Sequence, residues 1–217
     1  MAAPAPPPPM SPSTEAVGEV RLYHLPGRVD LADGETRQAP FLSAAHVPAH
    51  KTLRFRNDGF TSIETPEPAQ AIVSFATKGA AGFSDALPAG EMRIFESDVA
   101  GHAIFVGERR LAETPKGADL DIDLGQAADV TVKPTLVSAA AIGKRRVRYV
   151  MSYEIHNAKT AAASLELRQA GLVGKAIVHA ESEPGRSIDA STRGWTVTLP
   201  AGADTTLTLD VETMGQP

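Results

Sequence analysis

Apolar and polar residues alternate with a period of two along most of the chain after residue 18. The clearest case is the segment 146–156, whose apolar positions are Val147, Tyr149, Met151, Tyr153 and Ile155. A period of two puts successive side chains on opposite faces of a β-strand. We therefore predict a strand over this segment, ended by Asn157, because asparagine is a favoured turn residue.

The same period recurs in other short segments, about twelve strands in all, with turn residues every 8–12 residues or so. Two further apolar faces are Leu120/Ile122/Leu124, with Gly125 following, and Leu207/Leu209/Val211. No segment sustains the three-four spacing of an amphipathic helix. The chain is therefore predicted to be all-β, with an antiparallel β-sandwich architecture.

Three local patterns add detail to this prediction. Asp33-Gly34 is a strong hairpin signal, because both positions tolerate a positive φ, and we expect short strands on either side of it. Asp98 to Gly101 is expected to turn the chain between two more strands. The β-branched segment 69–78 is expected to lie in the centre of a sheet.

Composition suggests how the strands are divided into domains. Residues 1–15 are rich in proline and have nothing apolar to bury, so we expect a disordered linker there. Residues 16–126 are expected to form one β-rich subdomain and 127–217 a second, immunoglobulin-like sandwich. A further seam is expected at the small-residue run 139–143. The alternative is a single continuous core shared by both halves.

The overall composition excludes several classes of site and partner. The 217 residues include no cysteine, which rules out disulfides, thiolate metal sites and cysteine nucleophiles. The net charge of −5 argues against a nucleic-acid partner. No apolar run reaches the roughly 18 residues of a transmembrane helix. The N-terminus has neither the basic start nor the apolar core of a signal peptide.

Candidate metal ligands occur in two places, and neither has the expected spacing. Asp119, Asp121 and Asp123 alternate on one face of a strand, where carboxylates lie about 6.5–7 Å apart, too far to share an ion without other ligands. His46 and His50 have the spacing of a helical ligand pair, but Pro48 between them disfavours a helix. We expect no metal or other cofactor.

Signals for catalysis are also weak. There is no Gly-x-Ser-x-Gly nucleophile turn, although a triad assembled from distant strands stays open. Asp98, Asp121 and Glu154 are available as glycosidase carboxylates, but nothing singles out a pair. The Gly-rich segment 79–90 lacks the Lys-Ser/Thr ending of a phosphate loop. We therefore expect that the protein is not an enzyme.

Two segments are candidates for binding. The first is a surface loop between strands, with the candidate recognition residues Gly79, Gly82, Phe83, Ser84 and Asp85. The second is the only basic run, Lys144, Arg145, Arg146 and Arg148. It is interpreted either as a patch for an anionic polymer or lipid headgroup, or as positive charge that discourages edge-to-edge strand pairing.

Several segments resemble the C-terminal domain of bacterial mucoidy-inhibitor-like proteins, itself a domain of unknown function. The resemblance runs from about Val20 to Val211, through RLYHLPGRVDLADGETRQAPFLSA, LPAGEMRIFESDVAGHAIFVGE, ETPKGADLDIDLGQAADV, YEIHNAK and WTVTLPAGADTTLTLDV. It implies a β-rich domain, usually the downstream half of an exported envelope protein, and no catalytic residues.

From these observations we expect a non-catalytic binding or structural module of the bacterial cell envelope or periplasm. Its expected partner is another envelope protein or an upstream half of a longer chain. The absence of a signal peptide from this sequence leaves a cytoplasmic location open. The alternatives are a hydrolase acting on envelope polysaccharide or peptide, and a truncated remnant without an independent role.

Overall fold

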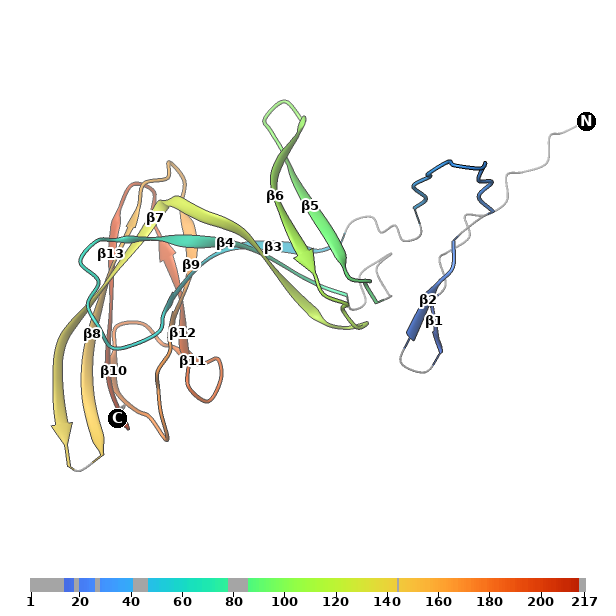
Figure 1. Cartoon of the computed structure of the whole chain (residues 1–217). Coiled ribbons are helices and arrows are strands. Elements are labelled where there is room, and N and C mark those ends of the chain that lie inside the picture. The colour runs from blue at the N-terminus through green and yellow to red at the C-terminus, as the bar shows by residue number, and fades with distance from the viewer. Residues whose placement is uncertain are drawn as a thin grey trace, which may run out of the picture. The chain divides into compact units, whose positions relative to one another are not determined.

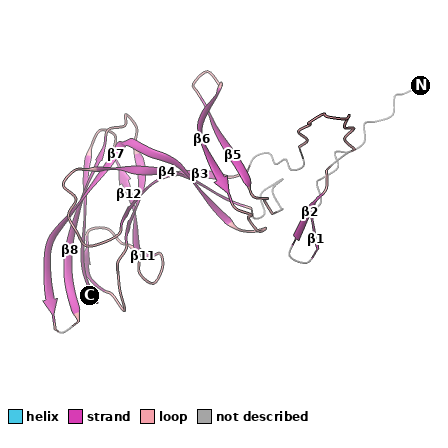
Figure 2. Ribbon diagram, viewed as in Figure 1, coloured by secondary structure: helices cyan, strands magenta, loops and turns pink. Residues whose placement is uncertain are grey.

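The fold is all-β, as the alternating pattern predicts. The computed structural model describes residues 14–17, 20–25, 28–40, 47–77, 86–143 and 145–214. In this part of the chain there are thirteen strands and no helix (Figures 1 and 2). It follows that none of the described residues forms a helix that could cross a membrane.

The described residues form two compact units. The first comprises those of 1–49, 75–92 and 110–120, and the second those of 50–74, 93–109 and 121–217. The expected boundary at residue 126 lies inside strand β7 (Asp119–Ile142), and the residues on both sides of it belong to the second unit. Residues 50–74 join the C-terminal residues because β3 (Ala49–Asn57) pairs with β9 (Ala163–Gln169).

The first unit contains little regular structure among its described residues. Strands β1 (Thr14–Val17) and β2 (Val20–Tyr23) form an antiparallel pair. The turn predicted at Asp33-Gly34 is present, with Gly34 at a φ of 75°. The strands predicted on either side of that turn are absent from residues 28–40, so that prediction is wrong. A lone hairpin without a third strand or a packing partner is only marginally stable, and Leu31 there is 62% exposed.

The second unit is built on a nine-stranded sheet with the order β10-β13-β8-β7-β4-β3-β9-β12-β11. The remaining strands of this sheet are β4 (Glu67–Ala76), β8 (Arg146–Asn157), β10 (Ile177–Glu181), β11 (Arg186–Ser187), β12 (Arg193–Leu199) and β13 (Asp204–Met214). Strand β4 is the middle strand, which confirms the expectation for the β-branched segment. The β3–β9 pair is parallel, so the sheet is mixed and not purely antiparallel.

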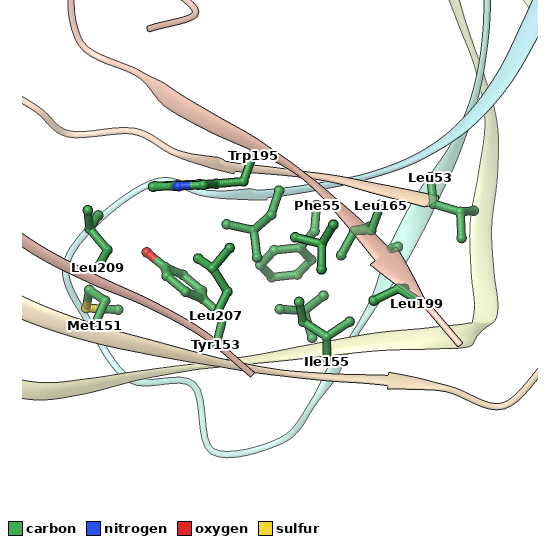
Figure 3. Packing of buried hydrophobic residues seen from close by; sticks show 14 of the residues in the cluster. Leu53, Phe55, Met151, Tyr153, Ile155, Leu165, Trp195, Leu199, Leu207 and Leu209 are labelled. Atoms are coloured by element: carbon green, nitrogen blue, oxygen red, sulfur yellow. The ribbon is translucent and has the colours of Figure 1, made fainter. Parts of the chain in front are cut away.

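The sheet is sandwich-like because its two ends face each other across one core. The rings of Tyr153 on β8 and Trp195 on β12 are 6.4 Å apart, although four strands lie between β8 and β12 in the sheet. Figure 3 shows side chains of β8 and β13 directed toward those of β3, β9 and β12. Six of the predicted inward positions are confirmed, since Met151, Tyr153, Ile155, Leu207, Leu209 and Val211 are each at most 1% exposed, whereas Val147 and Tyr149 are half-buried.

A buried polar network crosses this core. Gln169 on β9 accepts hydrogen bonds at Oε1 from the Tyr153 hydroxyl and from Asn57 Nδ2, the latter at 2.8 Å. Its Nε2 donates to the carbonyl oxygens of Gly59 and Ala170, at 3.0 and 2.7 Å. Burial raises the pKa of Tyr153, so the phenol stays neutral and its hydroxyl donates a hydrogen bond to Gln169 Oε1. The network therefore links β3, β8 and β9.

Strand β7 is longer than the sequence suggested. The apolar face Leu120/Ile122/Leu124 was expected to end at Gly125, before a domain boundary at residue 126, but residues 119–142 form one strand of 24 residues. Gly125 has a φ of 104°, which glycine adopts without a steric penalty, so the chain bends there without leaving the sheet. The expected seam at 139–143 is instead the end of β7 and the turn into β8.

Strands β5 (Gly90–Ser97) and β6 (Ala103–Leu111) form a separate two-stranded sheet. Their turn confirms the prediction for Asp98 to Gly101. Asp98 Oδ1 accepts hydrogen bonds from the backbone N–H groups of Ala100 and His102, each at 2.8 Å. Phe95 and Phe105 contact each other edge to face, with ring centroids 5.6 Å apart, and both are about half exposed.

Candidate functional site

A depression rich in charged side chains, in the described part of the second unit, lies on the outer side of β3, β4, β7, β9, β11 and β12. We call it the arginine cleft. Its charged residues are Arg54, Asp121, Glu166, Arg168 and Arg186, and its hydroxyl-bearing residues are Thr52, Ser74, Ser164 and Thr196. Its volume is about 400 Å³, within the range of roughly 300–1,000 Å³ typical of small-molecule sites.

Strand alternation explains why these side chains share one surface. On β9, Leu165 and Leu167 point into the core, so Glu166 and Arg168 point away from it. The ladders then set the neighbours of Glu166. Arg54 is its partner on β3 and Thr196 its partner on β12.

Glu166 is the centre of the cleft, because three guanidinium groups bind its carboxylate. Arg54 Nε donates to Oε2 at 2.8 Å, and Arg168 Nη2 donates to both oxygens at 2.9 Å. Arg186 Nη2 donates to Oε1 at 3.1 Å. Charge-assisted hydrogen bonds of this kind are stronger than neutral ones and fix the positions of the groups that make them.

The protonation state of Glu166 follows from these contacts. Burial by itself raises the pKa of this carboxyl, since its side chain is only 10% exposed. The hydrogen bonds and positive charge of Arg54 and Arg168 have the larger combined effect and leave the pKa below its usual range. Glu166 is therefore a carboxylate at neutral pH.

Asp121 holds the other side of Arg54. Its Oδ2 accepts from Arg54 Nη1 at 2.7 Å, and its Oδ1 accepts from the Ser74 hydroxyl at 2.6 Å. Burial raises the pKa of Asp121, but the Ser74 and Arg54 contacts outweigh this and lower it. Three guanidinium groups and two carboxylates leave the cleft with one positive charge that its own carboxylates do not balance.

The cleft also retains hydrogen-bond donors for a ligand. Arg168 Nε is buried and has no acceptor in the described structure. Arg186 is 66% exposed and engages Glu166 through Nη2, which leaves Nε and Nη1 facing no described acceptor. The arrangement can bind an anionic group. It shows no nucleophile or general base positioned for a reaction.

A second depression, of about 340 Å³, lies on the outer face of β7, β8 and β13. His156 Nδ1 is 2.7 Å from Asp204 Oδ1, and the ladders put Thr131 on the other side of His156. A carboxylate that orients an imidazole beside a hydroxyl is one part of a hydrolytic triad. However, His156 and Asp204 are 52% and 86% exposed, so solvent is not excluded from the pair.

The candidate site residues from the sequence analysis do not come together in one place. Residues 78–85 lie outside the described part of the chain, so the recognition loop Gly79, Gly82, Phe83, Ser84 and Asp85 stays a prediction. His46 also lies outside it, and His50 is exposed near the start of β3. The three carboxylates considered for glycoside hydrolysis lie in three different places. Asp98 is in the β5–β6 turn, Asp121 is in the arginine cleft, and Glu154 lines the second depression.

The predicted anion patch is already in contact with carboxylates. Arg148 binds Asp210 through two hydrogen bonds, and Arg146 binds Glu212 and also the carbonyl oxygen of Lys175. Arg145 is exposed in the turn before β8, and Lys144 lies outside the described residues. As an anion site, this patch stays a prediction. Asp210 and Glu212 balance the charges of Arg148 and Arg146, so this pair of arginines has no excess positive charge, whereas the arginine cleft has one.

The arginine cleft itself was not among the sequence-based candidates. Glu166 and Arg168 alternate with apolar residues in SLELR, which indicates a polar outer face. Arg54 and Arg186 lie far from this segment in the sequence, and no motif connects them to it. The pairings of β3 with β9 and of β11 with β12 bring these residues together.

In the part of the chain that the structure describes, no cluster of three or more acidic or histidine side chains could hold a metal ion. Comparisons of the chain with protein-family models, with curated proteins and with solved structures find no match. The resemblance to mucoidy-inhibitor-like proteins therefore stays an expectation, and the geometry carries the functional argument.

Proposed function

We propose that the protein is a non-catalytic binding module and that it holds an anionic group of its ligand in the arginine cleft. The observation that carries the proposal is the binding of three guanidinium groups to one carboxylate, Glu166, in a cluster with one positive charge in excess. The envelope location that we propose for the module rests on the sequence resemblance alone.

Preorganisation supports this function. A free arginine side chain loses conformational entropy when it binds a ligand. Here Glu166 and Asp121 already hold Arg54, and Glu166 already holds Arg168, so most of that entropy is lost on folding. The guanidinium fork presents paired N–H groups that match carboxylate and phosphate oxygens.

The test is an NMR titration that follows the arginine side-chain N–H signals during addition of acetate, sulfate or inorganic phosphate. We expect saturable shifts for Arg54, Arg168 and Arg186. Arg186→Gln should weaken binding about tenfold, since it removes a charge-assisted donor. Arg186 is 66% exposed, so this variant should keep the fold.

Arg56→Gln is the matched control. Arg56 is also an exposed arginine on β3 that pairs with a carboxylate, Asp58, but it does not line the cleft. Its replacement should leave the titration unchanged. The proposal is wrong if the cleft signals shift no more than that of Arg56, or if both variants weaken binding equally.

The envelope location has its own test. An antibody to the second unit, applied to fractions of the source bacterium, should detect the protein in the periplasmic or membrane fraction. Detection in the cytoplasm alone would contradict this part of the proposal and leave ligand binding untouched.

A hydrolase is the second candidate, and the His156–Asp204 pair at 2.7 Å is the observation that favours it. In this alternative, His156 takes the proton of Thr131 while Asp204 orients the imidazole. Turnover of p-nitrophenyl esters that is lost in both His156→Ala and Thr131→Val would support the alternative. Equal rates for the variants and the wild type would exclude it for that substrate class.

A further inference from the structure

We infer that the arginine cleft selects a singly charged carboxylate on a hydroxyl-bearing ligand, such as a sugar acid or another hydroxy acid, over divalent oxyanions. This inference rests on the proposed function and adds the ligand class. Three features of the cleft lead to it, namely its charge, the geometry of its open donors and its hydroxyl groups.

The charge count favours a monoanion. Arg54, Arg168 and Arg186 face the two carboxylates Glu166 and Asp121, which leaves one charge to be balanced. The single negative charge of a carboxylate balances it. A sulfate or a doubly ionised phosphate would bring a second negative charge next to Glu166, where like charges within a partly buried site repel strongly.

The open donors suit a planar group. Arg186 uses one N–H of Nη2 for Glu166, so the second N–H of Nη2 stays open and lies parallel to an N–H of Nε or of Nη1, on one edge of the flat guanidinium. Parallel N–H···O bonds from such an edge match the two coplanar oxygens of a carboxylate. The carboxylate of Glu166 is already bound by guanidinium groups in the cleft, and Arg168 Nη2 alone contacts both of its oxygens at 2.9 Å.

The hydroxyl groups extend recognition beyond the charge. Thr52, Ser164 and Thr196 line the cleft, and Ser164 and Thr196 are exposed. Thr196 is the ladder partner of Glu166, so the two side chains are neighbours on the same face of the sheet. A hydroxyl both donates and accepts, which suits the hydroxyl groups of a sugar acid. No aromatic side chain lines the described cleft, so stacking of the kind that holds neutral sugars is not its means of binding.

The test compares four probes with the whole chain by calorimetry or NMR, namely glucuronate, glucose, acetate and sulfate. Glucuronate should bind about tenfold more tightly than acetate, because it adds hydrogen bonds to the cleft hydroxyls. Sulfate should bind no better than acetate, and glucose should not bind measurably.

Thr196→Val keeps a β-branched residue in β12 and removes only the hydroxyl. It should weaken glucuronate binding several-fold and leave acetate binding unchanged. Thr198→Val is the matched control, since Thr198 is an exposed residue of the same strand that does not line the cleft.

The outcomes separate this inference from the proposed function. Saturable binding of sulfate that equals or exceeds that of glucuronate would overturn the selectivity and leave anion binding standing. Equal affinity for acetate and glucuronate would overturn the hydroxyl contribution. If none of the charged probes binds, the proposed function fails together with the inference.

Discussion

Arg54 and Glu166 are separated by 112 residues in the sequence and are direct partners in the parallel ladder of β3 and β9, where Arg54 Nε lies 2.8 Å from Glu166 Oε2. This ion pair does two things. It joins the N-terminal part of the second unit to its C-terminal part, and it sets the centre of the arginine cleft. Disturbing it should therefore affect both stability and ligand binding.

Replacing the central carboxylate is the direct test of its structural role. Glu166→Gln leaves three guanidinium groups around a neutral amide, and we expect a loss of about 1–3 kcal/mol in the free energy of unfolding, measured in urea. Glu183→Gln is the control, since Glu183 is an exposed carboxylate outside the cleft. Equal stability of the two variants would show that Glu166 does not stabilise the fold.

Stability should fall in acid, in a window that the pKa shifts define. Glu166, Asp121 and Glu181 each have a pKa below the usual range. For Glu181 the main cause is the hydrogen bond that Arg193 donates to its carboxylate. A carboxyl whose pKa is lower in the folded state stabilises the fold at every pH above its unfolded pKa, and this contribution is lost as pH falls through the folded pKa.

The free energy of unfolding should therefore be nearly constant with respect to these groups from pH 7 to about 5 and decline below about pH 4.5. In Glu166→Gln the decline should be shallower, because one of the titrating groups is absent. Urea unfolding at a series of pH values measures both slopes. A decline as steep as that of the wild type would rule out Glu166 as a contributor.

Gly185 is a position where only the absence of a side chain is tolerated. A Cβ added there would lie 2.5 Å from Trp195 Nε1 and 2.8 Å from Arg193 Nε. These atoms belong to a fixed cluster, since Arg193 Nε donates to Glu181 at 2.7 Å. Gly185→Ala should therefore destabilise the protein by about 1–3 kcal/mol through overpacking.

The emission of Trp195, the only tryptophan, reports on that change directly. Gly59→Ala is the matched control, because a Cβ there meets no atom within 4 Å and the backbone has no positive φ. An unchanged emission maximum and unfolding midpoint in Gly185→Ala would contradict the predicted clash.

Substitutions in the buried polar network should lower the free energy of unfolding by different amounts. Tyr153→Phe removes one donor while Gln169 Oε1 keeps its bond from Asn57, so we expect a loss of about 0.5–1.5 kcal/mol. Gln169→Leu leaves the buried Tyr153 hydroxyl without an acceptor and should cost more, about 1–3 kcal/mol. Thermal unfolding ranks the two variants, and the reverse order would mean that Gln169 is not the centre of the network.

The β5–β6 hairpin should open independently of the core. A two-stranded sheet is marginally stable, and the Phe95–Phe105 contact is its aromatic pair. Phe95→Ala should speed hydrogen exchange of the β5 and β6 amides and leave exchange in β8 and β13 unchanged. Faster exchange in β8 as well would show that the hairpin and the core unfold together.

By itself, the sequence determined the strand class and much of the core. Alternation at Met151, Tyr153 and Ile155, and again at Leu207 and Leu209, predicted which side chains are buried, because a strand has only two faces. The Asp98 to Gly101 turn was equally clear, since a turn depends on a few adjacent residues. Local patterns are enough wherever the physical cause is local.

Only the tertiary structure decided which strands are neighbours, and with that the site. The parallel pairing of β3 with β9 brings Arg54 to Glu166, and the position of β11 beside β12 brings Arg186 to the same carboxylate. Strand β7 also runs unbroken through Gly125. Such pairings depend on complementary surfaces far apart in the chain, and a pattern of period two is the same for every strand that satisfies it.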